Sequence, residues 1–344
     1  MGIPTGSMQP TLYGITKGNL GQAETMPTGV NSWVQHFLAG VSYHHLVSEG
    51  NWQLINVESP RKSFVFFNKQ RLTFRDTDTN NEIVRDISPP MNSGDSMLGS
   101  GRVLSEYVLN PHNNYTYKKG DYVINMHRES GDHLLIDRLT YNFRKPNRGE
   151  IIVFETKNIA GIANDLFYIK RLAGLPNEKI RIGDDRHLVI VDAPDDFVLH
   201  VGDNDKRLDA SDHPFEFVYS FDVAEEIPLA QDSRFSGHVN QRVFQQVLDE
   251  RRKTVARQNG VDPSQIRISY SGNISPNFMN GSHEFQIPQN RYLAFGDNTV
   301  SSKDSRDWGS LPGKNIFGKA SFIYWPFLGQ KHRIRPNRFG WAFQ

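Results

Sequence analysis

A serine and a lysine in two separate segments are the residues of this sequence best suited to do chemistry. Ser7 stands in residues 3–12, IPTGSMQPTL, where two prolines and a glycine restrict the backbone around one hydroxyl. Lys170 stands in residues 167–176, FYIKRLAGLP, whose aromatic and β-branched residues favour a half-buried strand that ends at the glycine and proline. Burial disfavours the charged form of a lysine, and a neutral lysine can act as a general base for a serine nucleophile.

A third segment is dense in small and charged polar residues. Its polar side chains include Asp297, Asn298, Ser302, Asp304 and Arg306. Taken alone, each of the three segments has an ordinary structural explanation: a chain-terminal turn, a lysine whose ammonium reaches water, or a solvated loop. Their occurrence in one chain is what predicts a single catalytic site.

The overall composition is that of an ordinary globular protein. The 344 residues carry 39 basic and 38 acidic side chains, so the net charge is close to zero. A charge balance of this kind gives no reason to expect nucleic acid as a partner. The absence of cysteine excludes thiol catalysis, thiolate metal sites and disulfides. The histidines show no metal-ligand spacing, and we expect neither a metal nor a cofactor. No stretch approaches the roughly 18 consecutive apolar residues of a membrane span.

Short strands separated by turns predict a mainly β protein with an antiparallel core. The expected strands lie at residues 121–126, 133–138, 150–155, in the lysine segment, and at residues 292–295 and 319–325. Strands and helices do not alternate in the way that is typical of parallel β-α-β units. Antiparallel pairing is therefore the expectation.

The positions of these strands divide the chain into a catalytic core and two insertions. The core is expected to comprise residues 1–14, 119–182 and 290–344, and the insertions residues 15–118 and 183–289. The first insertion is expected to contain a short helix near residues 32–45 and a strand at residues 63–67. The second is expected to contain an amphipathic helix at residues 239–258, because Val243, Val247 and Val255 recur at helical spacing.

Together these segments resemble the type I signal peptidases, membrane-bound serine peptidases that remove signal peptides from exported proteins. Residues 3–12 match the nucleophile box of that family, residues 148–154 its strand box, residues 168–176 its lysine box and residues 296–309 its last box. Each box alone is a weak signal. Four boxes in family order are specific.

The resemblance implies a signal-peptidase-like antiparallel β-sheet core and a role for each matching residue. Ser7 is the expected nucleophile, and Lys170 is the expected general base. Thr5 is expected to complete the oxyanion hole beside the Ser7 backbone N–H, and Ser302 to orient the amine of Lys170. The remaining matches are expected to support the loop: Asp297, Asn298, Asp304 and Arg306, the last two as an ion pair.

The resemblance also implies partners and a location. The expected substrate is the signal peptide of a preprotein, bound by strand addition and cut after small residues of the A-x-A type. A membrane lipid surface is the other expected partner, on the periplasmic face of a bacterial cytoplasmic membrane. Because the nucleophile box begins at Ile3, we expect this chain to lack the transmembrane anchor of the family. The basic residues 331–338 are expected to be a solvated tail or to attract anionic lipid.

Two other functions stay open on the sequence. A self-cleaving Ser/Lys peptidase of the repressor type would need an internal cleavage loop and a DNA-binding segment, and neither is evident. An inactive homologue could serve as a peptide-binding scaffold in export. Intact Ser7 and Lys170 argue against such a scaffold, and a cleavage assay separates the two.

Overall fold

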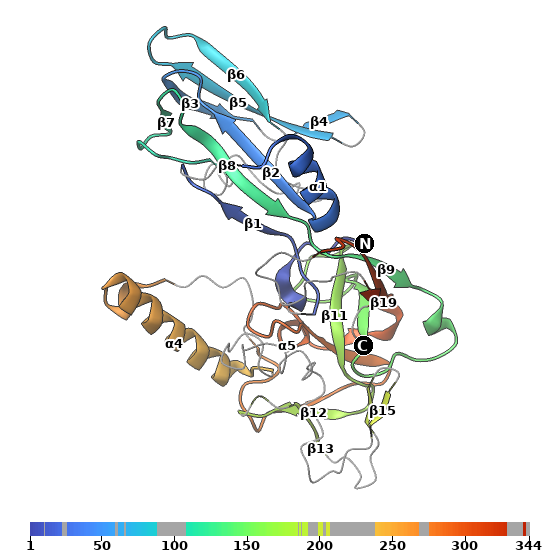
Figure 1. Ribbon diagram of the computed structural model, residues 1–344. Coiled ribbons are helices and arrows are strands. Elements are labelled where there is room, and N and C mark those ends of the chain that lie inside the picture. The colour runs from blue at the N-terminus through green and yellow to red at the C-terminus, as the bar shows by residue number, and fades with distance from the viewer. Residues whose placement is uncertain are drawn as a thin grey trace. The chain divides into compact units, whose positions relative to one another are not determined.

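The computed structural model of the chain describes most of its residues in two compact units. The described residues are 1–9, 11–22, 26–58, 61–64, 67–87, 108–184, 186, 188–191, 199–201, 204–206, 238–267, 275–328 and 340–341. One unit comprises Met1–Gly14 with Gly131–Gln344, and the other comprises Ile15–Ser130 (Figure 1).

A seven-stranded antiparallel sheet forms the centre of the first unit. Its order is β18-β17-β11-β10-β19-β20, and β9 also pairs with β19. The strands are β9 (His133–Asp137), β10 (Ile151–Glu155), β11 (Phe167–Gly174), β17 (Arg291–Phe295), β18 (Leu311–Pro312), β19 (Ile316–Trp325) and β20 (Gly340–Trp341). Every pairing in this sheet is antiparallel, so the predicted mainly β, antiparallel core is confirmed.

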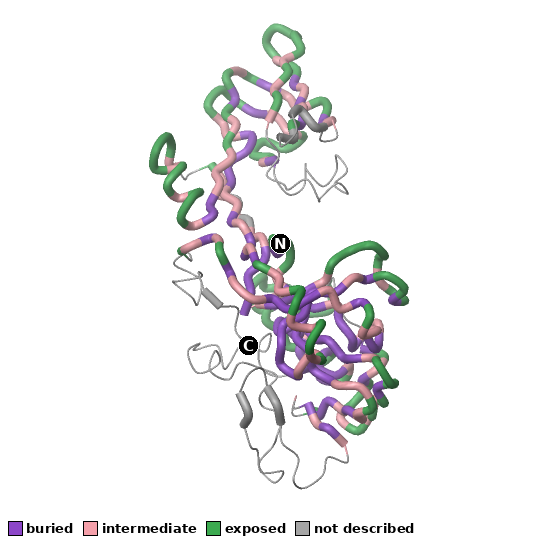
Figure 2. Tube along the Cα trace, turned by 90° about the vertical axis from the view of Figure 1, so that its right-hand side faces the viewer, coloured by how far each residue is buried: buried purple, intermediate pink, exposed green. Residues whose placement is uncertain are grey.

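Strand β10 alternates its side chains between two hydrophobic clusters, because successive residues of a strand point to opposite faces. Ile151 and Val153 pack in a cluster that also buries apolar side chains of the N-terminal segment. Ile152 and Phe154 pack in a second cluster, with Leu172 of β11. The first cluster therefore attaches the N-terminal segment to the sheet. Figure 2 shows the buried positions in purple.

A smaller sheet extends this core into the second predicted insertion. It consists of β12 (Lys179–Ile182), β13 (Leu188–Val191) and β16 (Glu284–Gln286), and a separate hairpin is formed by β14 (Leu199–Val201) and β15 (Asn204–Lys206). One hydrophobic cluster joins Ile180 and Ile190 to Phe295 of β17. Residues on both sides of the expected boundary at 182/183 thus share one core and belong to one unit.

The amphipathic helix predicted at residues 239–258 is α4 (Gln241–Asn259). The Asn240 side chain caps its first turn by accepting a hydrogen bond from the Val243 N–H. Gly260 ends it with a left-handed backbone, at a φ of 64°. Val243 and Val247 are buried, as the helical spacing predicts.

The described residues of the second unit form two antiparallel sheets and one helix. The first sheet pairs β1 (Thr16–Asn19), β8 (Tyr122–Glu129) and β2 (Val41–Val47). The second pairs β4 (Arg61–Phe64), β5 (Phe67–Asp76), β3 (Trp52–Val57) and β7 (Thr116–Tyr117), with β6 (Glu82–Ile87) on β5. Strand β8 was expected in the catalytic core, but it pairs with β1 and β2 instead. The boundary consequently falls after Ser130, not after residue 118.

The helix expected near residues 32–45 is α1 (Gly29–Ala39), and the prediction is wrong beyond residue 39. Gly40 ends the helix at a φ of 68°, and the β-branched and aromatic residues that follow form β2.

The strand expected at residues 63–67 falls on the end of β4 and the start of β5. Residues 65, 66 and 331–338 lie outside the described residues. Within the described part of the chain, no helix combines the length and the apolarity that crossing a membrane requires.

Candidate active site

Ser7 lies in a short 3₁₀ turn, η1 (Gly6–Met8), that the last loop holds by its backbone. Asn298 donates twice to this turn, from its backbone N–H to the Ser7 carbonyl at 3.0 Å and from Nδ2 to the Gly6 carbonyl at 3.0 Å. Ser7 is 7% exposed, and Met8 beside it is fully buried against the sheet. The serine hydroxyl therefore sits on a turn that is fixed on both sides.

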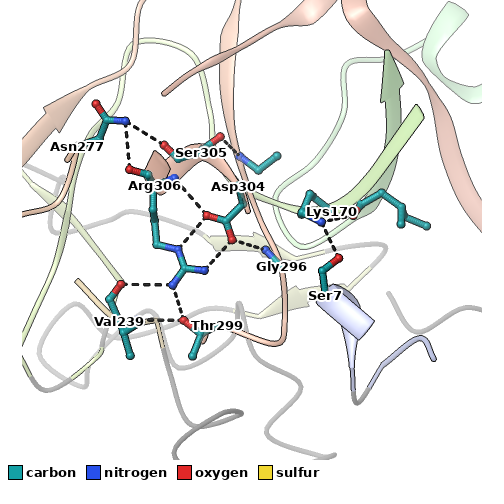
Figure 3. Close-up of polar contacts among 11 residues, drawn as sticks. Ser7, Lys170, Val239, Asn277, Gly296, Thr299, Asp304, Ser305 and Arg306 are labelled. Carbon is teal, nitrogen blue, oxygen red and sulfur yellow. Dashed lines mark hydrogen bonds and ion pairs between the residues drawn. The ribbon is translucent and has the colours of Figure 1, made fainter. Parts of the chain in front are cut away.

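Lys170 lies on β11, opposite Ile152 of β10, and is 4% exposed. Its Nζ is 2.7 Å from Ser7 Oγ and 3.0 Å from the Ile169 carbonyl oxygen (Figure 3). The fold thus brings a serine and a lysine that are 163 residues apart in sequence into hydrogen-bond contact.

Burial lowers the pKa of Lys170 to about 8. The carboxylates of Asp304 and Asp297 act in the opposite direction and raise this pKa, while the Arg306 guanidinium lowers it. With a pKa of about 8, about one lysine in ten is neutral at pH 7, compared with fewer than one in a thousand for a free lysine. The lone pair of the neutral amine can accept the Ser7 proton.

Thr5 immediately precedes the Ser7 turn, with extended backbone angles of φ −121° and ψ 157°. Its Oγ1 lies 3.4 Å from Ser7 Oγ. The backbone of Thr5 is packed so closely on Gly14 that a Cβ on Gly14 would lie 2.1 Å from the Thr5 carbonyl carbon. The hydroxyl is thus beside the nucleophile, and its role in the oxyanion hole stays a prediction.

Asp304 and Arg306 form a fully buried bidentate ion pair at the start of α5 (Ser305–Trp308). Arg306 Nε is 2.9 Å from Asp304 Oδ1, and Nη2 is 2.7 Å from Oδ2 (Figure 3). Burial alone would raise the pKa of Asp304, but Arg306, the Gly296 N–H and the Ser302 hydroxyl hold it below its ordinary value. Arg306 also donates to Thr299 Oγ1 and to the Val239 carbonyl, which joins the loop to the segment before α4.

Ser302 is completely buried, next to Gly296. A Cβ on Gly296 would lie 2.1 Å from Ser302 Oγ and 2.5 Å from the Ser7 carbonyl oxygen, so only glycine fits there. The Ser302 hydroxyl is one of the groups that lower the pKa of Asp304. Its expected role in orienting Lys170 stays a prediction.

Three further side chains beside the site were not singled out from the sequence. Arg171 binds the Asp297 carboxylate, and Thr11 binds the same carboxylate. Asn277 Nδ2 donates to the carbonyl groups of α5, at distances of 3.2 to 3.3 Å. An arginine in an apolar strand signals a buried carboxylate partner, although it does not say which one. Nothing in the sequence signals Asn277.

Comparison with known proteins gives a consistent result. The sequence profile of the family described as Signal peptidase, peptidase S26 matches residues 122–325, more than half of the chain. Signal peptidase I of Buchnera aphidicola from Acyrthosiphon pisum is 24% identical over 233 residues, which cover 61% of this chain and 69% of that protein. Signal peptidase I of Aquifex aeolicus is 25% identical over 203 residues, which cover 57% and 69%.

Among solved structures, a signal peptidase I from Enterococcus faecalis matches 52% of this chain and 98% of its own, at 18% identity and a TM-score of 0.23. The profile and the bacterial relatives define the class of protein as a serine endopeptidase. Within that class, the chain belongs to the signal peptidase family, peptidase S26.

Proposed function

We propose that this protein removes N-terminal signal peptides from exported preproteins, with Ser7 as nucleophile and Lys170 as general base. The observation that carries the proposal is the 2.7 Å separation of Lys170 Nζ and Ser7 Oγ, both of them buried. A nucleophile within hydrogen-bond reach of a base whose pKa lies near the working pH is the arrangement that acyl transfer needs.

The reaction follows from this geometry in two steps. Neutral Lys170 takes the proton of Ser7 Oγ as the oxygen attacks the scissile carbonyl, and the lysine then gives that proton to the departing amine. That amine is the new N-terminus of the mature protein, which leaves in this first step. Lys170 next removes a proton from a water molecule, whose oxygen attacks the acyl-serine. Collapse of this second intermediate returns the proton to Ser7 Oγ and releases the signal peptide. The negative oxygen of each tetrahedral intermediate is stabilised by the Ser7 backbone N–H and the Thr5 hydroxyl.

The substrate is an extended peptide that adds to the sheet through main-chain hydrogen bonds, with small residues at the first and third positions before the cut. This substrate class is tested by incubating the protein with a signal-peptide-bearing preprotein and locating the cut by mass spectrometry. Cleavage after an A-x-A sequence supports the proposal. An uncut preprotein at all pH values from 7 to 10 would favour the inactive peptide-binding scaffold instead.

Thr5→Val is expected to lower kcat by about 10²- to 10³-fold and to leave KM nearly unchanged, because one missing oxyanion donor costs about 3 to 4 kcal/mol in the transition state alone. Thr5→Ser, which keeps the hydroxyl, is the matched control and should stay close to wild type. Steady-state kinetics on a signal-peptide substrate measure both constants. A wild-type kcat for Thr5→Val would remove Thr5 from the oxyanion hole.

The proposal places the enzyme at a lipid surface, on the outer face of a bacterial cytoplasmic membrane, and the orientation of α1 supports contact with lipid. The helix faces β2 with polar side chains: Gln35 accepts a hydrogen bond from the Tyr43 hydroxyl, and His36 Nδ1 is 2.9 Å from Ser42 Oγ. Its exposed side chains include five large apolar ones, Val30, Trp33, Val34, Phe37 and Leu38, beside the polar Asn31 and His36. This is the reverse of an ordinary surface helix, whose apolar stripe faces the core.

Two further features of α1 fit a lipid interface better than an ordinary protein surface. Trp33 and Phe37, 65% and 51% exposed, stack with ring centroids 5.7 Å apart. Residues 26–47 contain no Asp, Glu, Lys or Arg, so no charge would be buried among the headgroups. Helices that lie in the membrane interface use aromatic and aliphatic side chains in this way.

Replacing Trp33 and Phe37 together by glutamine is therefore expected to weaken binding to phosphatidylcholine vesicles by roughly tenfold or more, since burying one such side chain is worth about 1.5–3 kcal/mol. Vesicle flotation measures this binding. The control is the double change Ile55→Gln/Val84→Gln, which removes two exposed apolar side chains elsewhere in the same unit. Equal binding by the two double variants would contradict a lipid contact through α1.

A further inference from the structure

One carboxylate connects all three segments of the candidate site. Asp297, in the last loop, accepts hydrogen bonds at 2.9 and 2.7 Å from Nε and Nη2 of Arg171 on β11. The same carboxylate accepts a hydrogen bond from Thr11 Oγ1 in the nucleophile segment, at 2.5 Å. Arg171 Nη2 is also 3.3 Å from Thr11 Oγ1. All three side chains are buried, with exposures of 1% to 4%.

The members of this triad are neighbours of the residues that do the chemistry. Arg171 follows Lys170 on β11. Asn298 follows Asp297, and its two hydrogen bonds hold the backbone of Gly6 and Ser7 at 3.0 Å. The dipeptide 297–298 therefore holds the nucleophile segment at two places, at the Ser7 turn through Asn298 and four residues later through the Thr11 hydroxyl.

Two overlapping hydrogen-bonded turns connect these two points. The Gln9 N–H donates to the Gly6 carbonyl at 3.1 Å across Ser7, and the Leu12 N–H donates to the Met8 carbonyl at 2.9 Å across Thr11. A shift at Thr11 is therefore passed to Ser7 through the shared residues Met8 and Gln9. Met8 and Leu12 are completely buried and hold these turns on the sheet through apolar contacts, which have no direction. The Thr11 hydroxyl adds a directional contact to the strand that carries Lys170, through Asp297 and Arg171.

We propose that Thr11 is a positioning residue, whose hydroxyl on the Asp297–Arg171 pair sets the separation of Ser7 Oγ and Lys170 Nζ. This inference rests on the proposed function. Proton transfer between the two groups requires hydrogen-bond distance. A loss of the Thr11 contact lets the nucleophile turn shift relative to β11, and a misplacement of about 1 Å can lower a rate about 10²-fold.

The test compares Thr11→Val, which keeps the shape of the side chain but lacks the hydroxyl, with Thr11→Ser, which keeps the hydroxyl. We expect kcat to fall about 10²-fold in Thr11→Val, with KM and the midpoint of the pH–rate profile unchanged, because substrate contacts and the surroundings of Lys170 are retained. Thr11→Ser should restore kcat to within about threefold of wild type.

The matched control is Thr156→Val, at a completely buried threonine whose hydroxyl is 3.2 Å from the Leu166 carbonyl oxygen and 3.0 Å from the Leu166 nitrogen, away from the site. It removes a buried hydroxyl of the same kind and should lower the unfolding temperature with kcat unchanged. If Thr11→Val does not fold, Thr11→Ala takes its place.

A wild-type kcat in Thr11→Val, a fall in kcat that Thr11→Ser does not restore, or an unfolded protein in both the Val and the Ala variants would overturn the proposal. A shift in the pH midpoint without a fall in the plateau would also overturn it, since that would mean an electrostatic effect through Asp297. Ser7→Ala is run in parallel. An inactive Ser7→Ala with a fully active Thr11→Val refutes this inference alone, whereas an active Ser7→Ala refutes the proposed function.

Discussion

Ser7→Ala is expected to abolish cleavage of a signal-peptide substrate and to leave the fold intact. The proposed chemistry passes through the Ser7 oxygen, which forms the acyl intermediate, so the loss should approach the factor of about 10⁶ that follows removal of a nucleophile from other serine peptidases. The fold should survive because the change removes one oxygen atom and Met8 and Leu12 still anchor the segment in the core. Product formation is measured by mass spectrometry, and the fold by circular dichroism.

The matched control for this prediction is Ser48→Ala, at a buried serine of the second unit whose hydroxyl donates to the Gly50 carbonyl at 2.6 Å. This control should cleave at the wild-type rate. Turnover by Ser7→Ala within tenfold of wild type would mean that another group is the nucleophile.

Lys170→Met is expected to be inactive and, at neutral pH, more stable than the wild type by about 3 kcal/mol. Burial lowers the pKa of Lys170 from 10.5 to about 8, and each pKa unit corresponds to about 1.36 kcal/mol of stability. The sign follows from proton binding, since between pH 8 and 10.5 the unfolded chain holds the lysine proton more tightly than the folded one. The destabilisation of the folded protein by the buried, charged lysine is therefore fully present below pH 8. It falls between pH 8 and about 10.5, and above that pH it is absent.

Urea unfolding of wild type and Lys170→Met at pH 7 and pH 10.5 measures this gain, which should shrink as the pH rises. Lys319→Met is the matched control, because Lys319 is also buried but lies 3.1 Å from the Glu150 carboxylate. Lys319→Met removes this ion pair and leaves the buried Glu150 carboxylate without the lysine, so the variant should be less stable than wild type. Destabilisation by Lys170→Met at pH 7 would mean that the lysine is not strained by its burial.

The strands of the catalytic core could be predicted from sequence because the side-chain pattern is local. A run such as Phe167 to Ile169 indicates a strand wherever it occurs, and its turn residues mark its end. Which strands pair is not local. Strand β8 carries a clear strand pattern, yet its partners β1 and β2 place it in the second unit. Helix α1 ends at Gly40, and a left-handed residue at that point overrides the pattern on either side.

In the site, too, the types of the residues could be predicted from local sequence, whereas their contacts could not. A constrained serine and a buried lysine can be recognised as chemical types, but the partners of buried charges depend on strand register. Arg171 pairs with Phe295 across β11 and β17, and this register brings Asp297, two residues later, to the guanidinium. A shift of one residue would turn that side chain to the other face. The role of Thr11 follows from the same register and could not be inferred from its neighbours in sequence.

The pH–rate profile of wild-type kcat/KM, with Lys170→Arg measured beside it, tests the Ser7–Lys170 pair most directly. A neutral amine is the active form, so the rate should rise tenfold per pH unit below an apparent pKa of about 8 and level off above it. Lys170→Arg should show no activity at any pH, because a guanidinium stays protonated. A profile that rises only above about pH 10, the range of a free lysine, or an active Lys170→Arg enzyme would contradict the assignment of Lys170 as the base.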